Sequence, residues 1–157
     1  MSKRKALQKM SESKLYVLMH ARLVYNDEYT YRDEGFIDIE RKAFLTPDEA
    51  EQGRITALRE YAEDFLCSSN YDDIIYSVFQ TEREDELRRA FEVLGLKFEE
   101  GKRRDHEAIR DTLRDAYLEL AESTKGVSAE QVEAICALMA TDLVEVVALD
   151  VKKGLGL

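Results

Sequence analysis

The feature that most constrains the fold of this chain is an alternation of apolar residues over residues 14–25. Every second position is apolar, the set being Leu15, Val17, Met19, Ala21, Leu23 and Tyr25. A period of two is typical of a β-strand with one buried face, so the pattern predicts that these side chains face the core. The positions between them are only partly apolar, and we expect that second face to be partly covered.

A second strand and a helix are predicted directly after the first strand. Residues 33–35, Asp-Glu-Gly, are favoured as a turn because glycine tolerates a positive φ, and residues 26–28 as a turn or bulge. Residues 36–44 then form the second strand. The Thr-Pro-Asp-Glu sequence at residues 46–49 predicts a helix start, with Thr46 as the N-cap in a capping box.

The remaining two thirds of the chain reads mainly as helix. Apolar stripes with helical spacing occur in residues 55–66, 87–94, 109–120 and 132–139. Residues 71–80 fit a helix or a strand, and we favour a helix. N-caps are predicted at Thr81, Asp105 and Ser128. Residues 143–151 are rich in valine and leucine, which predicts a C-terminal strand that joins the sheet.

Together these segments predict one α+β domain over residues 14–151. Its small antiparallel sheet combines two or three N-terminal strands with the C-terminal strand and is packed by four or five helices. Residues 1–13 are polar and basic without a steady period, so we expect a flexible arm, and residues 152–157 form a tail. A length of 157 residues suits a single domain with its own core.

The charge of the chain bears on its partners. The net charge is −10, and residues 26–100 hold nine Lys or Arg against 21 Asp or Glu, a net charge of −12. Residues 1–25 hold six Lys or Arg against one acid. The acidic middle would repel phosphate backbones, which argues against nucleic acid and favours a partner with a basic surface. The alternative is that the charged helix faces only keep the chain soluble.

The sequence also bears on compartment and on cysteine chemistry. No apolar run reaches the roughly 18–20 residues that span a bilayer. The basic start of the chain is not followed by the apolar stretch of a secretory signal, so a cytoplasmic protein is expected. Cys67 and Cys136 are far apart, and no disulfide is expected between them. Cys136 falls in an apolar stripe and is predicted to be a core residue.

Two parts of the chain carry a resemblance. Residues 25–29 read Tyr-Asn-Asp-Glu-Tyr after a strand and are followed by the capped helix. Near the other end, Ser-Ala-Glu-Gln-Val at residues 128–132 precedes Leu-Val-Glu-Val-Val at residues 143–147. In these blocks the chain resembles a group of small acidic bacterial proteins with no assigned function. The resemblance covers residues 14–50 and 128–151 and implies no activity.

No known enzyme signature occurs in the sequence. The two histidines, His20 and His106, have no metal-ligand spacing to an acid or a cysteine, so no metal site and no cofactor are predicted. No nucleophile elbow or glycine-rich phosphate loop is found. Acids at residues 72–73 and 82–86 could form a glycosidase-type pair, but they lie at predicted helix starts, where capping and the helix dipole explain them.

The candidate partner-binding residues are the tyrosines and acids around the first predicted turn. They are Tyr25, Asp27, Glu28, Tyr29, Tyr31, Asp33 and Glu34. Tyrosine is enriched at binding hot spots, and the acids would meet Lys or Arg on a partner. The alternative is that the tyrosines cover the sheet as cross-strand aromatic pairs.

The expected function is therefore a non-enzymatic protein-interaction module, in concrete form an inhibitor or immunity-like protein that masks a basic partner surface. Two alternatives stay open. One is a small enzyme or ligand-binding protein with a dispersed site. The other is a structural subunit that forms a homo-oligomer through its sheet edge.

Overall fold

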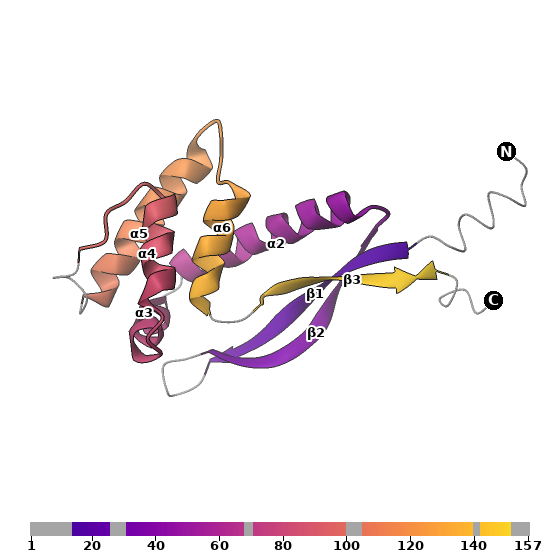
Figure 1. The fold of residues 1–157 in the computed structure, drawn as a ribbon, viewed down its shortest axis with the longest axis horizontal. Helices are drawn as coiled ribbons and strands as arrows, with labels where there is room; N and C mark the ends of the chain where they lie inside the picture. Colours follow the sequence, from indigo (N-terminus) through magenta and orange to yellow (C-terminus); the bar gives the residue numbers. More distant parts are fainter. Residues whose placement is uncertain (1–13, 26–30, 68–70, 100–104, 140–141, 152–157) are drawn as a thin grey trace, which may run out of the picture.

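The computed structural model describes residues 14–25, 31–67, 71–99, 105–139 and 142–151. The described elements follow the predicted order of two strands, a run of helices and a last strand (Figure 1). They are β1 (Lys14–Tyr25), β2 (Tyr31–Phe44), α2 (Pro47–Cys67), α3 (Tyr71–Gln80), α4 (Glu84–Val93), α5 (His106–Glu122), α6 (Ala129–Cys136), the 3-10 turn η2 (Ala137–Met139) and β3 (Val144–Asp150). The predicted α+β class is confirmed, and residues 71–80 are helical.

The three strands form one antiparallel sheet in the order β2-β1-β3. The central strand is β1, which pairs with its neighbour in sequence on one side and with the C-terminal strand on the other. The backbone N–H of Ala21 also donates to the carbonyl of Leu143, at 2.8 Å, just before β3 begins. The prediction that the valine-rich C-terminal segment joins the sheet is therefore confirmed.

The predicted turn at residues 33–35 is wrong. Asp33 pairs with Leu23 and Phe36 pairs with Ala21, so residues 33–35 lie inside β2, and the chain reverses between Tyr25 and Tyr31. One residue of β1 lies between these two pairs, whereas two residues of β2 lie between them, which is a β-bulge. The backbone freedom of glycine suits a bulge as well as a turn, so a glycine in the sequence does not distinguish the two.

Two further register shifts lie between Val17 and Met19 and between His20 and Ala21. In each, β2 advances by more residues than β1. Bulges of this kind increase the twist and bend the strand that carries them. Figure 1 shows the result, since β2 curves away along its length.

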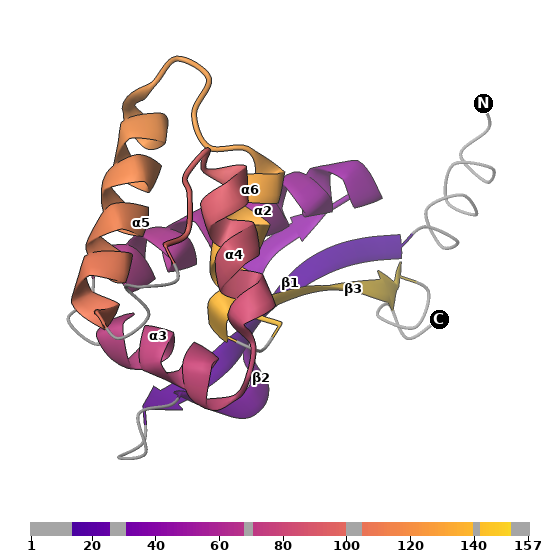
Figure 2. The ribbon, with the colours of Figure 1, turned by 60° about the vertical axis from the view of Figure 1, so that its left-hand side comes forward.

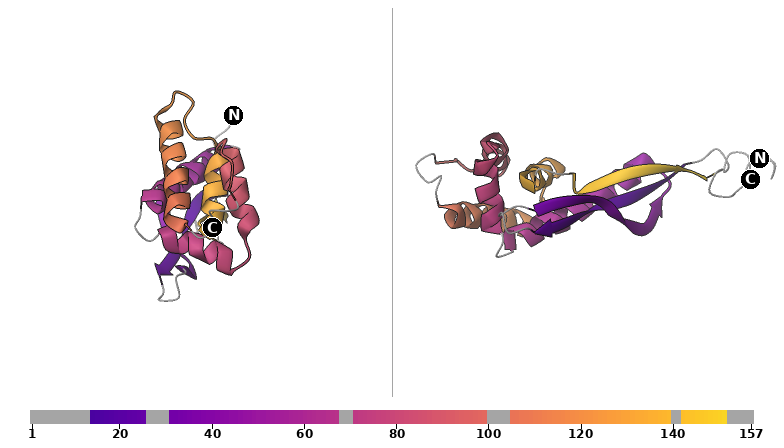
Figure 3. Two further views of the ribbon diagram at one scale, coloured as in Figure 1. Left: turned by 90° about the vertical axis from the view of Figure 1, so that its left-hand side faces the viewer. Right: turned by 90° about the horizontal axis from the view of Figure 1, so that it is seen from below.

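One helix, α2, connects the sheet to the rest of the molecule. It contacts all three strands and also packs against α3, α5 and α6. Figure 2 shows α3, α4 and α5 gathered in a helical body, and Figure 3 shows the sheet extending away from that body. Fully buried side chains run through the interior, among them Leu18, Leu66, Ile75, Leu87, Leu113 and Ile135. Each contributes about 1.5–3 kcal/mol through burial.

The helix starts follow the predicted caps with one exception. Thr46 accepts from the Glu49 N–H at 3.2 Å and Asp105 from the Ala108 N–H at 3.0 Å, while Ser128 forms a reciprocal capping box. The cap predicted at Thr81 is wrong. Its hydroxyl donates to the Ser77 carbonyl at 2.8 Å, at the end of α3, and accepts from Nε of Arg83 at 2.8 Å. The N-cap position of α4 is Arg83, and no side chain caps that helix start.

Candidate functional site

The two faces of the sheet differ from the prediction. Leu18 is fully buried, Tyr16 packs against the core, and His20 lies against Tyr61 of α2. The predicted buried positions Leu15, Val17 and Met19 are instead only half-buried, on the opposite face. The prediction of the buried face was wrong for these three positions, because the other face of β1 is also partly apolar, whereas Ala21 of the predicted set is buried. Which of the two faces is covered depends on where α2 packs.

The face turned away from α2, here called the outer face, is apolar on two strands. Residues directly opposite each other in an antiparallel pair share a face, so the register places Val147 beside Val17 and Leu149 beside Leu15. The outer face therefore comprises Leu15, Val17, Met19, Glu145, Val147 and Leu149. Leu149 is 48 % exposed, and none of the apolar members belongs to the core. The right-hand view of Figure 3 looks onto this side of the sheet, with α2 behind the strands.

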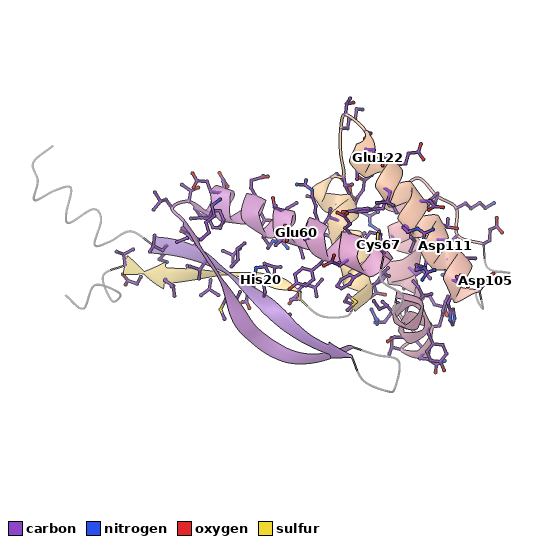
Figure 4. The ribbon with its side chains drawn as sticks, turned by 180° about the vertical axis from the view of Figure 1, so that it is seen from behind. His20, Glu60, Cys67, Asp105, Asp111 and Glu122 are labelled. Atoms are coloured by element: carbon purple, nitrogen blue, oxygen red, sulfur yellow. The ribbon has the colours of Figure 1, made fainter. Side chains whose placement is uncertain are left out.

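The opposite face of the sheet forms a groove with α2. Its volume is about 800 Å³, and it is lined by His20, Lys42, Ala43, Phe44, Glu49, Gln52, Gly53, Thr56, Ala57, Glu60 and Tyr61. Figure 4 places His20 between the sheet and α2, which carries Glu60. The volume is in the range of small-molecule sites, and the lining mixes aromatic rings with groups of both charges.

One polar contact organises the groove. Nδ1 of His20 and the hydroxyl of Tyr61 lie 3.4 Å apart, and their rings are tilted at 35°. No carboxylate is hydrogen-bonded to His20 within the described part of the chain. A histidine acting as a general base is usually oriented by such a third group.

The floor of the groove depends on a glycine inside α2. A Cβ at Gly53 would lie 2.5 Å from Cζ of Phe44, which is closer than two non-bonded carbon atoms come in folded proteins. Phe44 is buried, and Lys42 places its Nζ 5.5 Å from the centroid of the same ring. Gly53 therefore lets β2 and α2 pack closely at this end of the sheet.

The predicted partner-binding residues are only partly described. Asp27, Glu28 and Tyr29 lie outside the described residues. Tyr25 and Tyr31 are paired across the ends of β1 and β2, and this backbone pairing also suits the alternative that they form a cross-strand pair. Asp33 and Glu34 belong to β2 at the first bulge and not to a turn. The structure thus brings the described members to one end of the hairpin.

The outer face was missed as a candidate site, although a signal for it exists in the sequence. The run Val144 to Leu149 has apolar residues on both faces, which is typical of a strand covered on two sides. In the described structure the helices lie on one side only (Figure 3). Both faces of β3 are thus apolar, but the described helices pack against only one of them.

The cysteines are free. Cys136 is buried, its thiol donates to the carbonyl of Leu58 at 3.4 Å, and burial raises its pKa to about 12. A thiol held in the neutral form is a poor nucleophile and a poor metal ligand. Cys67 is exposed at the end of α2. The prediction of Cys136 as a core residue is confirmed.

Two arginine side chains connect helices to each other. Arg54 joins Glu51 on its own helix to Glu133 on α6. The hydrogen bond from Arg54 lowers the pKa of Glu51, and the bonds from both acids raise the pKa of Arg54. Arg83 donates to the carbonyls of Ala137 and Leu138. These contacts hold α2 and the α3–α4 connection against α6 and η2.

Two kinds of site are absent from the described residues. None of the helices there is long and apolar enough to cross a membrane. No group of three or more His, Cys, Asp or Glu side chains is arranged to hold a metal ion in the part of the chain that the structure describes.

Comparisons with known proteins add no relative. No protein-family model, no curated protein and no solved structure matches this chain. The resemblance seen in the sequence blocks thus stays a prediction.

Proposed function

We propose that this protein is a non-enzymatic interaction module that binds a basic protein partner through the outer face of its sheet. The observation that carries the proposal is the row of apolar side chains at Leu15, Val17, Met19, Val147 and Leu149, on the side of the sheet away from α2. Leu149 is 48 % exposed and the other four side chains are half-buried, so the row keeps part of its apolar surface in contact with solvent. Contiguous apolar surface that stays accessible on a folded domain marks interaction sites. Burying such surface stabilises a complex by about 25 cal/mol per Å² before the costs of association.

The charge of the chain favours a basic partner over a second copy. Two copies would each bring a net charge of −10, and their repulsion opposes self-association. Glu145 lies on the outer face opposite Met19 and would meet Lys or Arg on the rim of a partner. Tyr25, Asp27, Glu28, Tyr29, Tyr31, Asp33 and Glu34 stay further candidates for the contact on the evidence of the sequence. An inhibitor that covers a basic site of another protein is the concrete form of this proposal.

The test is capture of the partner with a matched pair of variants. Leu149→Lys places a positive charge on the outer face, whereas Ala121→Lys makes the same charge change at an exposed position near the end of α5. The partner captured by the parent from a lysate of the native host is identified by mass spectrometry and then titrated. We expect Leu149→Lys to weaken binding at least tenfold, about 1.4 kcal/mol, and Ala121→Lys to leave it unchanged.

Salt and sizing separate the alternatives. Binding of a basic partner should weaken as salt rises, because rim charges are screened over about 10 Å at 0.1 M. Equal binding by both variants at all salt concentrations would show that the outer face is not the interface. If the parent elutes at twice 18.1 kDa and the Leu149→Lys variant elutes as a monomer, the outer face is instead the interface of a homo-oligomer.

A ligand-binding protein is the second candidate, favoured by the groove between the sheet and α2. Its volume of about 800 Å³ and the His20–Tyr61 pair suit a small polar molecule. Native mass spectrometry of the purified protein would detect such a molecule. Tyr61→Phe removes only the hydroxyl and should reduce its retention if the groove holds it.

A further inference from the structure

We propose that the partner adds an extended strand to the free edge of β3, so that the sheet continues into the partner. This inference rests on the proposed function and names how the partner binds. Among the described residues, β3 has β1 on one side and no strand on the other. An open edge of this kind presents backbone donors and acceptors to another chain.

The hydrogen-bond phase of the sheet identifies which groups face outward. The bond from the Ala21 N–H to the Leu143 carbonyl makes that pair a hydrogen-bonded one. Hydrogen-bonded pairs alternate along an antiparallel ladder, so the N–H groups of Glu145, Val147 and Leu149 point toward β1. Those of Val146 and Ala148 therefore point away from the sheet, at its open edge.

The two edges of the sheet differ in how well they can accept a strand. The outer strand β2 carries three register shifts against β1, and such bulges protect an edge from pairing. In contrast, β3 pairs with β1 from Val144 to Asp150 without a shift. It also contains no proline and no glycine. The regular, unprotected edge is thus the one that lies beside the apolar outer face.

The side chains of β3 indicate the chemistry of the added strand. On the outer face, Glu145, Val147 and Leu149 alternate along the edge. An added strand would place apolar residues beside Val147 and Leu149 and a Lys or Arg beside Glu145. Such a strand would extend the apolar face and match its acidic end, which agrees with a basic partner and not with a second acidic copy.

A synthetic peptide provides the direct probe. The sequence Lys-Val-Thr-Val-Thr-Lys-Thr, paired antiparallel, places valines beside Leu149 and Val147 and a lysine beside Glu145. Amide hydrogen exchange, followed by NMR at about 1 mM peptide, reports on the edge. In the free protein we expect the amides of Val146 and Ala148 to exchange at least tenfold faster than that of Val147. The peptide should slow the exchange of Val146 and Ala148.

The control peptide carries N-methyl groups on the amides that would face β3, which removes its donors without changing its charge. It should give no protection. Equal protection by both peptides, or no protection of Val146 and Ala148 by the first, would overturn the edge proposal.

Two proline variants connect the edge to the native partner. Ala148→Pro removes an outward N–H, so the ladder to β1 should survive while partner binding falls at least tenfold. Val147→Pro removes an N–H that points to β1 and should lower the melting temperature instead. If Ala148→Pro keeps the partner and Leu149→Lys loses it, the edge proposal is wrong and the proposed function stands. If both keep it, the proposed function itself is wrong.

Discussion

Substitution of Gly53 by alanine tests the close packing between β2 and α2. Gly53 lies well inside α2, where glycine is normally about 1 kcal/mol less favourable than alanine. On propensity alone, Gly53→Ala should therefore stabilise the protein. The new Cβ would, however, lie 2.5 Å from Cζ of Phe44 and 3.1 Å from its Cε2, so the ring or the helix must shift.

The expected magnitude follows from these two opposing terms. Forcing an extra methyl group into a packed site costs about 1–3 kcal/mol. Set against the gain of about 1 kcal/mol in helix propensity, Gly53→Ala should lower the free energy of unfolding by roughly 0–2 kcal/mol. If Phe44 is the cause, shortening that ring should remove the penalty. In the Phe44→Leu background we expect Gly53→Ala to become neutral or stabilising.

The assay is urea unfolding of the four proteins in this double-mutant cycle, followed by circular dichroism. The coupling free energy between the two positions should be of order 1 kcal/mol and should favour the double variant. A single variant Gly53→Ala that is about 1 kcal/mol more stable than the parent would refute the reasoning. If Gly53→Ala changes the free energy of unfolding equally in the parent and in the Phe44→Leu variant, Phe44 does not limit the space at Gly53.

Three further predictions concern the helices, the thiol and the last strand. Ser128→Ala should lower the free energy of unfolding by about 0.5–2 kcal/mol, and Thr81→Ala should cost less because Thr81 caps no helix; urea midpoints of the two variants test this. Burial raises the pKa of Cys136 to about 12, so the unfolded chain, with a thiol pKa near 9.0, loses its proton first. The contribution of the neutral Cys136 thiol to stability is therefore complete below about pH 9 and is lost as the pH rises toward 12. The free energy of unfolding, measured over this pH range, should depend less on pH in Cys136→Ala than in the parent. Truncation after Asp142 removes β3 and uncovers Leu18, so the melting transition should be lost; an unchanged melting temperature would contradict the role of β3.

Much of the secondary structure follows from local sequence. Gly95 ends the segment after α4 with a φ of 74°, and the Ser128 capping box starts α6, because such signals depend on residues within one turn. Thr81 shows the limit of this reasoning. The same sequence signature can complete the preceding helix, and only the positions of α3 and α4 decide between the two.

The candidate site was less predictable. The tyrosines and acids of residues 25–34 are evident in the sequence, but the groups that the structure brings together lie elsewhere. His20 and Tyr61 meet from two elements that are 41 residues apart. The outer face combines β1 with β3 from opposite ends of the chain. A single sequence contains no information on such pairings beyond the tendency of apolar strands to join a sheet.

The sequence by itself determined the order of strands and helices, the α+β class, the acidic character and the membership of β3 in the sheet. Periodicity and capping carry this information because they act between residues that are neighbours along the chain. Only the tertiary structure decided which face of β1 is buried, since Leu18 and Val17 are equally apolar and α2 can cover one face alone. It also decided that Gly35 lies in a bulge and that β3 is an edge strand that pairs with β1 without a register shift. These outcomes depend on packing between distant segments, where the free energy of the whole arrangement selects among locally equivalent choices.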